Sequence, residues 1–279
     1  MWFVFALLAA VMGTFYALLA RFLLKGKGDP MAFALILQFV TALTILMIMP
    51  FEKVSYDFSP INMLLIIIVG VGTALIAKLF IEGRQMEEAS NVSIAAQVGG
   101  IWSILGGAVI LGEALTPYKI IGALLIIFGN LLVFLRKGKI QLTKGMKTIV
   151  IASILFSTAT FGDKYVLRTF SPALYNVLVY FLSSLSFLIV ARFDFRRVRK
   201  EIALQGPLIF LASAVFGVGI YLFEKAVQMG EVSRVFLVNN TSIVLTVLLG
   251  ILLLKERENI FRKIVAAIMV FIGAYLLMM

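Results

Sequence analysis

The chain has 279 residues, of which 62% are hydrophobic and only 14% are charged, and its formal net charge is +11. Soluble domains are about 45–50% apolar and about 25% charged, so this composition excludes an ordinary soluble protein and places the basic residues at a membrane surface rather than on nucleic acid. Cysteine and histidine are absent from the sequence, which excludes disulfides, thiol nucleophiles, imidazole proton relays and zinc sites built from these residues.

Ten apolar runs follow one another along the chain, each close to the ~20 residues that a helix needs to cross a hydrocarbon core of ~30 Å. Pro, Gly and charged residues cluster in the breaks between the runs. The expected fold is an all-α integral membrane protein with ten transmembrane helices, because lipid offers no hydrogen-bond partner for the backbone of any other single span. The runs cover residues 2–24, 31–50, 61–82, 89–111, 116–135, 146–168, 172–191, 206–228, 232–254 and 260–279.

Two polar turns, QMEEAS at 85–90 and QMGEVS at 228–233, share four of six letters and stand 143 residues apart. At the same offset Gly107 pairs with Gly250, and Glu113 pairs with Glu256. We therefore predict two repeats of five spans each, covering residues 1–138 and 144–279. Because five is odd, the second repeat enters the membrane upside down relative to the first. Two inverted five-helix repeats are a plan common among secondary transporters, whose substrate site lies near the midplane between the halves.

The segments that carry the repeat also carry a family resemblance. Residues 79–134, with GE before a short loop and then IGALLI, resemble the second half of an EamA domain of the drug/metabolite transporter (DMT) superfamily. Residues 227–277 resemble the same segment, with KE in place of GE. The resemblance implies two five-helix domains, cytoplasmic termini, and export of amino acids and other metabolites or import of sugars and related compounds. Many EamA domains carry a proline where this chain has Gly100 and Ile243, so a proline-broken helix is not expected here.

Basic residues are divided unevenly between the two sets of loops. The loops and helix ends after the odd-numbered runs hold eighteen Lys and Arg residues, and the other set holds five. The positive-inside rule puts the richer side in the cytoplasm, so that both termini face outward. The family resemblance implies the reverse orientation. We expect the plasma membrane of a prokaryotic cell and favour the charge count, because its bias is large.

Polar side chains inside apolar runs are costly, so each is a candidate for function. Gln97 and its counterpart at the repeat offset, Asn240, lie ~12 Å into their runs at 1.5 Å per residue. These amides, with Asn239 beside them, could bind a polar group of the substrate, or they could join helices by hydrogen bonds. Further candidates to line a binding cavity, with ordinary packing as the alternative, are Trp102, Tyr16, Tyr180 and Tyr221.

Charged residues near the ends of runs could serve in binding, coupling or gating, or as structural ion pairs close to the interface. Lys78 is the deepest of them and would suit a substrate carboxylate, and its spacing from Glu82 also allows an i,i+4 pair. Glu82, Glu224 and Asp163 are the candidates for coupling or gating. We interpret Glu113 as a residue that packs its loop.

The preferred hypothesis is a secondary transporter, which we expect to be an exporter, of small organic metabolites, amino acids or amphipathic drugs. It would work by alternating access between the two inverted repeats. A lipid flippase or scramblase is the alternative, because it needs only a groove. An enzyme is not expected, since no poised acid pair stands at midplane depth. We expect no metal, no cofactor, no nucleic acid and no obligate protein partner, only a small-molecule substrate and membrane lipids.

Overall fold

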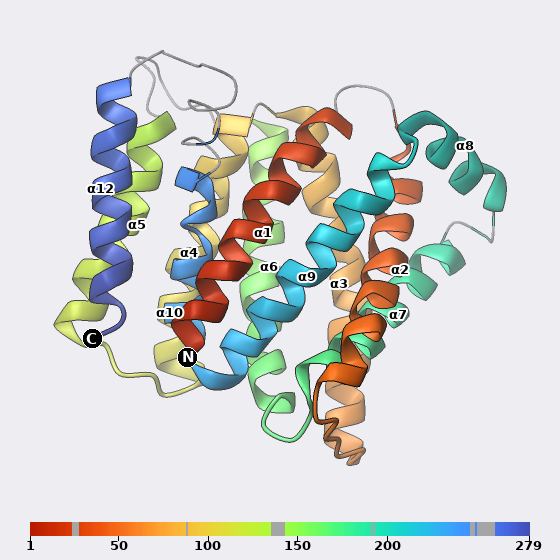
Figure 1. Cartoon of the computed structure of the whole chain (residues 1–279), viewed down its shortest axis with the longest axis horizontal. Coiled ribbons are helices and arrows are strands. Elements are labelled where there is room, and N and C mark those ends of the chain that lie inside the picture. Colours follow the sequence, from red (N-terminus) through yellow and green to blue (C-terminus); the bar gives the residue numbers. More distant parts are fainter. Residues whose placement is uncertain are drawn as a thin grey trace.

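A computed structural model describes residues 1–23, 28–87, 89–134, 143–190, 192, 194–245, 249 and 260–279. Within these ranges every regular element is helical, and Figure 1 shows the helices as one bundle. The elements are α1 (Trp2–Leu23), α2 (Pro30–Ile48), the 3-10 turn η1 (Met49–Phe51), α3 (Pro60–Met86), α4 (Ala89–Ile110), α5 (Pro117–Phe134), α6 (Lys144–Val166), α7 (Pro172–Val190), α8 (Phe195–Gln205), α9 (Leu208–Met229), α10 (Val232–Asn239) and α12 (Ile260–Leu276).

Length and composition make six of the described helices able to cross a membrane, namely α1, α2, α3, α6, α7 and α9. Shorter apolar helical stretches cover Ala95–Ile110, Pro117–Leu132 and Val232–Leu245. The prediction of a helical, multi-pass membrane protein is therefore confirmed. A helix satisfies its own backbone amides, which is why these apolar runs fold in this way in lipid.

Local signals in the sequence start several helices. Proline is the first residue of α2, α3, α5 and α7, where its missing amide leaves no donor unsatisfied. Asp29 caps α2 by accepting hydrogen bonds from the amides of Met31 and Ala32, at 3.0 and 3.3 Å. Thr143 caps α6 in the same way through the amide of Met146, at 3.2 Å. These helix starts are thus encoded by single residues.

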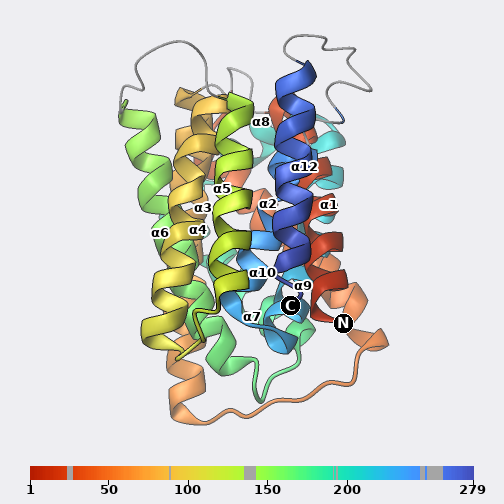
Figure 2. The same ribbon diagram turned by 90° about the vertical axis from the view of Figure 1, so that its left-hand side faces the viewer.

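The helices lie side by side along one direction, and both termini lie at the same end of the bundle (Figures 1 and 2). We call this end the terminal face; it also holds the connections α2–α3, α4–α5, α6–α7 and α9–α10. Helix α1 starts at the terminal face and α6 ends there, so the two run in opposite directions (Figure 1). The opposite face holds the connection α3–α4 and helix α8.

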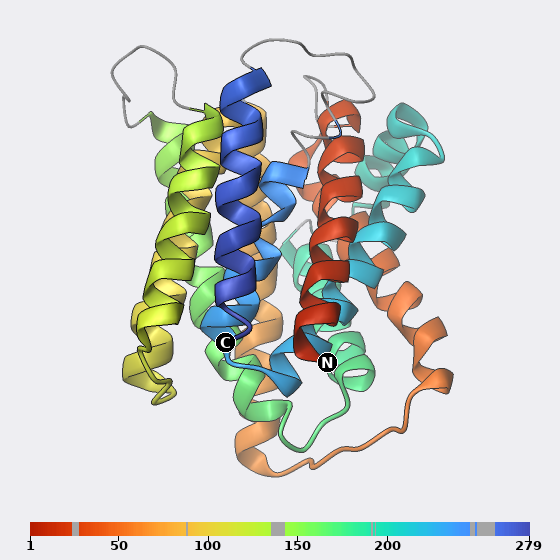
Figure 3. The ribbon, with the colours of Figure 1, turned by 60° about the vertical axis from the view of Figure 1, so that its left-hand side comes forward.

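The most extensive packing joins α1–α5, which we call the first half, to α6–α12, the second half. The largest contacts are those of α1 with α9, α5 with α12, α3 with α6, and α2 with α7. Figure 3 shows α12 lying alongside α5. At this contact a Cβ atom on Gly122 would lie 2.8 Å from the carbonyl oxygen of Gly273, so the two backbones approach directly.

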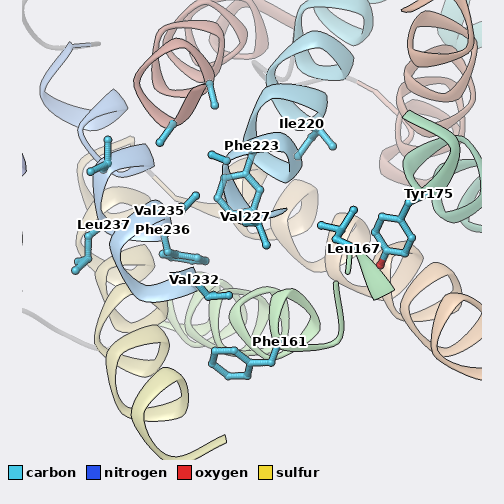
Figure 4. Packing of buried hydrophobic residues seen from close by; sticks show 14 of the residues in the cluster. Phe161, Leu167, Tyr175, Ile220, Phe223, Val227, Val232, Val235, Phe236 and Leu237 are labelled. Carbon is cyan, nitrogen blue, oxygen red and sulfur yellow. The ribbon is translucent and has the colours of Figure 1, made fainter. Parts of the chain in front are cut away.

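The largest buried apolar cluster contains side chains from α6, α9 and α10 (Figure 4). Phe223 of α9 and Phe236 of α10 meet with ring centroids 6.4 Å apart, and Phe156 of α6 packs on both. Gly106 of α4 lies against the ring of Phe161, where an added Cβ would stand 2.4 Å away. Close contact at such glycines lets α4 approach α6.

Two features differ from the predicted runs. Helix α8 occupies the charged stretch between the runs 172–191 and 206–228, where only a break is expected. The run 232–254 is also interrupted: α10 ends at Asn239, residues 240–241 form a turn, and helix resumes at Ser242. The rest of that run, apart from residue 249, lies outside the described residues, as does Glu256.

Candidate functional site

Two amide side chains, from α4 and α5, meet inside the bundle beside the turn that follows α10. The Asn130 side chain donates from Nδ2 to Gln97 Oε1 at 3.4 Å and to the Asn240 carbonyl oxygen at 3.3 Å. Gln97 and Asn130 are 3% and 1% exposed. Asn240 lies against α4, because a Cβ on Gly100 would stand 3.1 Å from its Nδ2. We call Gln97, Asn130 and Asn240 the amide cluster.

The amide cluster has unused hydrogen-bonding capacity. Asn130 Oδ1, an acceptor, and Asn240 Nδ2, a donor, are buried without a hydrogen-bond partner among the described residues, and so is Thr241 Oγ1. A buried polar atom left in this way costs about 1–3 kcal/mol. A bound group that both donates and accepts hydrogen bonds can therefore satisfy these atoms and be stabilised by them.

The interruption after α10 follows from its residues. Asn239, Asn240 and Thr241 carry short polar side chains that compete with the helix for backbone hydrogen bonds. The amide of Thr241 bonds to the Val238 carbonyl at 3.0 Å, a three-residue rather than a four-residue step. The turn leaves the Asn240 carbonyl able to accept from Asn130. An interrupted helix of this kind is tolerated in a membrane where it lines a polar site.

The structure separates the aromatic candidates from the amide cluster. Tyr16 of α1 and Tyr180 of α7 both pack on Phe216 of α9, at 4.8 and 6.2 Å between ring centroids. The Arg84 guanidinium also lies over Tyr16, 5.5 Å from the ring centroid. These residues form a second group, on the side of the bundle where α1, α7 and α9 meet.

The remaining candidates lie in three other places. Trp102 is 38% exposed and donates from Nε1 to Thr158 Oγ1 at 2.9 Å. Tyr221 donates to Glu52 Oε1 at 3.3 Å. Lys78 and Glu82 form an i,i+4 pair with Nζ and Oε1 3.8 Å apart and side chains 42% and 32% exposed. Such an exposed pair contributes about 0–1 kcal/mol to stability. Lys78 therefore pairs with Glu82 and is not part of the amide cluster.

Asn130 and Glu52 are the residues that sequence reasoning missed. Asn130 has no polar counterpart in the second repeat, since Ala274 stands at the matching position, so the repeat did not draw attention to it. A lone Asn within IIFGNLLVF was the available signal. Glu52 pairs with Lys225 and accepts from the amide of Ala173, at the start of α7, at 3.0 Å. Glu52 lies in a polar loop, where a charged residue is ordinary, so the sequence does not indicate this role.

Asp163 of α6 and Glu224 of α9 are each 4% exposed. The Tyr175 hydroxyl donates to Asp163 Oδ1, whereas Glu224 Oε2 has no hydrogen-bond partner within the described part of the chain. Both lie within one turn of the hydrogen bond from Lys164 Nζ to the Val227 carbonyl, at 2.7 Å, which joins the ends of α6 and α9. Buried acids of this kind are rare in membrane helices and mark functional sites.

Charged residues at the terminal face join the two halves. Glu113 accepts from the amides of Val232 and Ser233, at 2.6 and 3.3 Å. Lys119, which is fully buried, lies between Glu113 and Glu231 at 3.0 and 3.1 Å. The structure thus shows Glu113 packing its loop, and packing it against the start of α10.

A pocket of about 520 Å³ opens beside these charges. Residues from both halves line it, and the amide cluster is not among them. The lining residues are Trp2, Leu111, Gly112, Glu113, Lys164, Arg168, Met229, Gly230, Glu231 and Arg234.

The comparison with protein families decides the class of this chain. The model of the EamA-like transporter family matches it twice, over residues 1–135 and 143–279. The chain belongs to the EamA-like transporter family. It is therefore a membrane transporter of the DMT type, as the resemblance predicts. No curated protein matches the sequence.

Solved structures support the fold of this EamA-family chain. Among 29 matching chains, a structure described only as "Crystal structure of protein" aligns with a TM-score of 0.79. The alignment covers 100% of the EamA chain and 98% of the other, at 14% sequence identity. At that identity the likeness establishes the fold alone.

Proposed function

We propose that this EamA-family chain is a secondary transporter, with export as the expected direction, of small organic metabolites, amino acids or amphipathic drugs. It spans the plasma membrane of a prokaryotic cell ten times, as two inverted five-helix repeats. Substrate binds between the halves, and the halves rearrange to expose it to each side in turn.

The packing of the halves supports the inverted arrangement. If α6, α7, α9, α10 and α12 correspond to α1–α5 in order, the large contacts fall into matched sets. The contact of α1 with α9 matches that of α3 with α6, and the contact of α2 with α9 matches that of α3 with α7. The contacts of α2 with α7 and of α5 with α12 each join two corresponding helices, so exchanging the halves leaves each contact unchanged. Such pairing is what a twofold axis between inverted repeats produces.

The amide cluster carries the proposal for the substrate site. It joins helices of both halves, and it lies at an interrupted helix. Asn130 Oδ1 and Asn240 Nδ2 offer a bound solute one acceptor and one donor that the described residues leave unused. Amides carry no net charge, so the site suits the polar group of an amphipathic molecule, with an apolar body against the surrounding helices.

Flux into proteoliposomes tests the proposal. Purified protein is reconstituted and assayed with a panel of amino acids, other metabolites and amphipathic drugs. For a transported solute, Asn130→Ala and Asn240→Ala are expected to weaken binding about tenfold, as loss of one hydrogen bond to substrate predicts. Asn176→Ala is the matched control, because this buried amide of α7 bonds within its own helix, to the Pro172 carbonyl at 2.8 Å.

Three outcomes would contradict the proposal. The first is the absence of flux for the whole panel. The second is equal loss in the Asn176→Ala control, which would reduce the amide cluster to a structural element. The third is scrambling of fluorescent lipids without solute flux, which would favour the alternative, a lipid scramblase.

A further inference from the structure

Two buried acidic side chains lie in the second half, and no cation among the described residues pairs with either of them. Asp163 belongs to α6 and Glu224 to α9, both 4% exposed, where hydrogen bonds from Lys164 to the Val227 carbonyl and from Gln228 to the Leu167 carbonyl join the two chain segments. The lysine next to each in sequence points elsewhere. Lys164 donates to the carbonyls of Val227, Gln228 and Gly230, at 2.7, 3.2 and 2.8 Å, and Lys225 pairs with Glu52.

The described residues supply the pair with one hydrogen bond, whereas two carboxylates would need several. Tyr175 donates to Asp163, and Glu224 Oε2 has no partner among the residues described. The other titratable groups that face the pair are tyrosines: Tyr180 of α7 interacts with both acids, and Tyr16 of α1 interacts with Tyr180. Helices α2 and α4, which pack on α9 and α6, contain no titratable residue. Helix α3, which also packs on α6, carries Lys78 and Glu82, which pair with each other, and Arg84, which lies over Tyr16.

Charge balance then determines what the pair binds. An isolated carboxylate in an apolar core is strongly disfavoured unless it is paired, and two adjacent ones also repel each other. The pocket at the terminal face comes within one residue of Asp163 along α6, since Lys164 lines it. We propose that Asp163 and Glu224 share a dissociable proton and form the proton-binding site that drives this transporter.

The position of the pair explains how a proton would affect transport. Helix α9 packs on α1 and α2, and α6 packs on α3 and α4. With the shared proton in place, α6 and α9 stay together. Release of the proton leaves two like charges that push α6 and α9 apart. This movement alters the packing of α9 on α1 and α2 and the packing of α6 on α3 and α4. This step rests on the proposed transport function, whereas binding of the proton does not.

Infrared spectroscopy of the protein in lipid nanodiscs tests proton binding directly, with pH as the only probe. The wild-type protein is expected to show a carbonyl band of a protonated carboxyl group that disappears as pH rises. Glu224→Gln and Asp163→Asn, which keep the size of the side chain, should remove that titration. Glu82→Gln is the control: it changes an exposed acid and should leave the band unchanged. Tyr175→Phe, which changes no charge, should shift the midpoint.

Flux measurements test the coupling. In proteoliposomes the wild-type protein should accumulate substrate in response to a pH gradient, and Glu224→Gln should lose that response while still exchanging substrate. A titrating band without any solute flux would refute the transport function and leave the proton site supported. The proton site is overturned if no band titrates, if neither acid variant changes it, or if sodium at constant pH removes it. Gradient-driven accumulation in Glu224→Gln would overturn the coupling.

Discussion

Glu113, in the connection between α4 and α5, accepts a 2.6 Å hydrogen bond from the backbone amide of Val232, the first residue of α10. The two residues belong to different halves of the chain. The bond places a carboxylate at the start of a helix, where free amides and the helix dipole favour negative charge. Glu113 therefore fixes α10, and with it the turn at Asn240, against the first half.

The first prediction concerns this contact. Glu113→Gln should lower the free energy of unfolding by about 1–3 kcal/mol, because it weakens the bonds to α10 and leaves the buried Lys119 with one acid instead of two. Unfolding of the protein in mixed micelles by a denaturing detergent measures the change. Glu82→Gln is the control and should cost at most about 1 kcal/mol, since its pair is exposed. Equal losses in both variants would contradict the prediction.

The second prediction concerns the contact of α5 with α12. Gly122→Ala should destabilise the protein by about 1–3 kcal/mol, because the added methyl group meets the Gly273 carbonyl, which belongs to a backbone and cannot turn aside. Gly72→Ala in α3 is the control: nothing lies within 4 Å of its Cβ position. Alanine there should stabilise the helix by up to about 1 kcal/mol. Stabilisation by both substitutions would show that α5 and α12 do not touch.

The third prediction concerns pH and the start of α2. Partial burial favours a raised pKa for Asp29, but hydrogen bonds from Arg197 and from the amides of Ala32 and Met31 outweigh it and lower the pKa below its usual value. A group whose pKa is lower in the folded state stabilises the protein above its unfolded pKa, about 3.9 for Asp, and this contribution is lost as pH falls through the folded value.

Thermal unfolding between neutral pH and pH of about 3 tests this sign. Asp29→Asn should lower Tm at neutral pH, and the difference from wild type should shrink as the medium becomes more acidic. Arg197→Gln should show the same trend, because it removes the guanidinium that stands 2.5 Å from Asp29. A difference that grows on acidification would contradict the assignment.

The fourth prediction concerns orientation. The chain has no cysteine, so one cysteine placed after Met279 or at position 1 gives a single label site. The charge count predicts that an impermeant thiol reagent labels either terminus in intact cells. A cysteine in place of Arg196 on α8, at the opposite face, should be labelled only after the cells are opened. The reverse pattern would support the orientation that the EamA family resemblance implies.

The sequence by itself determined most of the described helices and the family. Apolar runs of about 20 residues, prolines at helix starts and caps such as Asp29 act within a few residues, so their effects can be predicted without knowing any neighbour. The same holds for the pair of Lys78 and Glu82, whose spacing along one helix brings them together. The internal repeat is also visible in the sequence, and the EamA family model matches the chain in two corresponding segments.

Only the tertiary structure decided which polar groups meet. Asn130 reaches Gln97 across 33 residues and Asn240 across 110, and neither distance can be predicted from a single helix. In a membrane the lipid-facing and protein-facing sides of a helix are both apolar, so the pattern does not reveal which side Trp102 or Asn130 occupies. That choice depends on how each helix is rotated against its neighbours, which close contacts such as Gly122 with Gly273 determine.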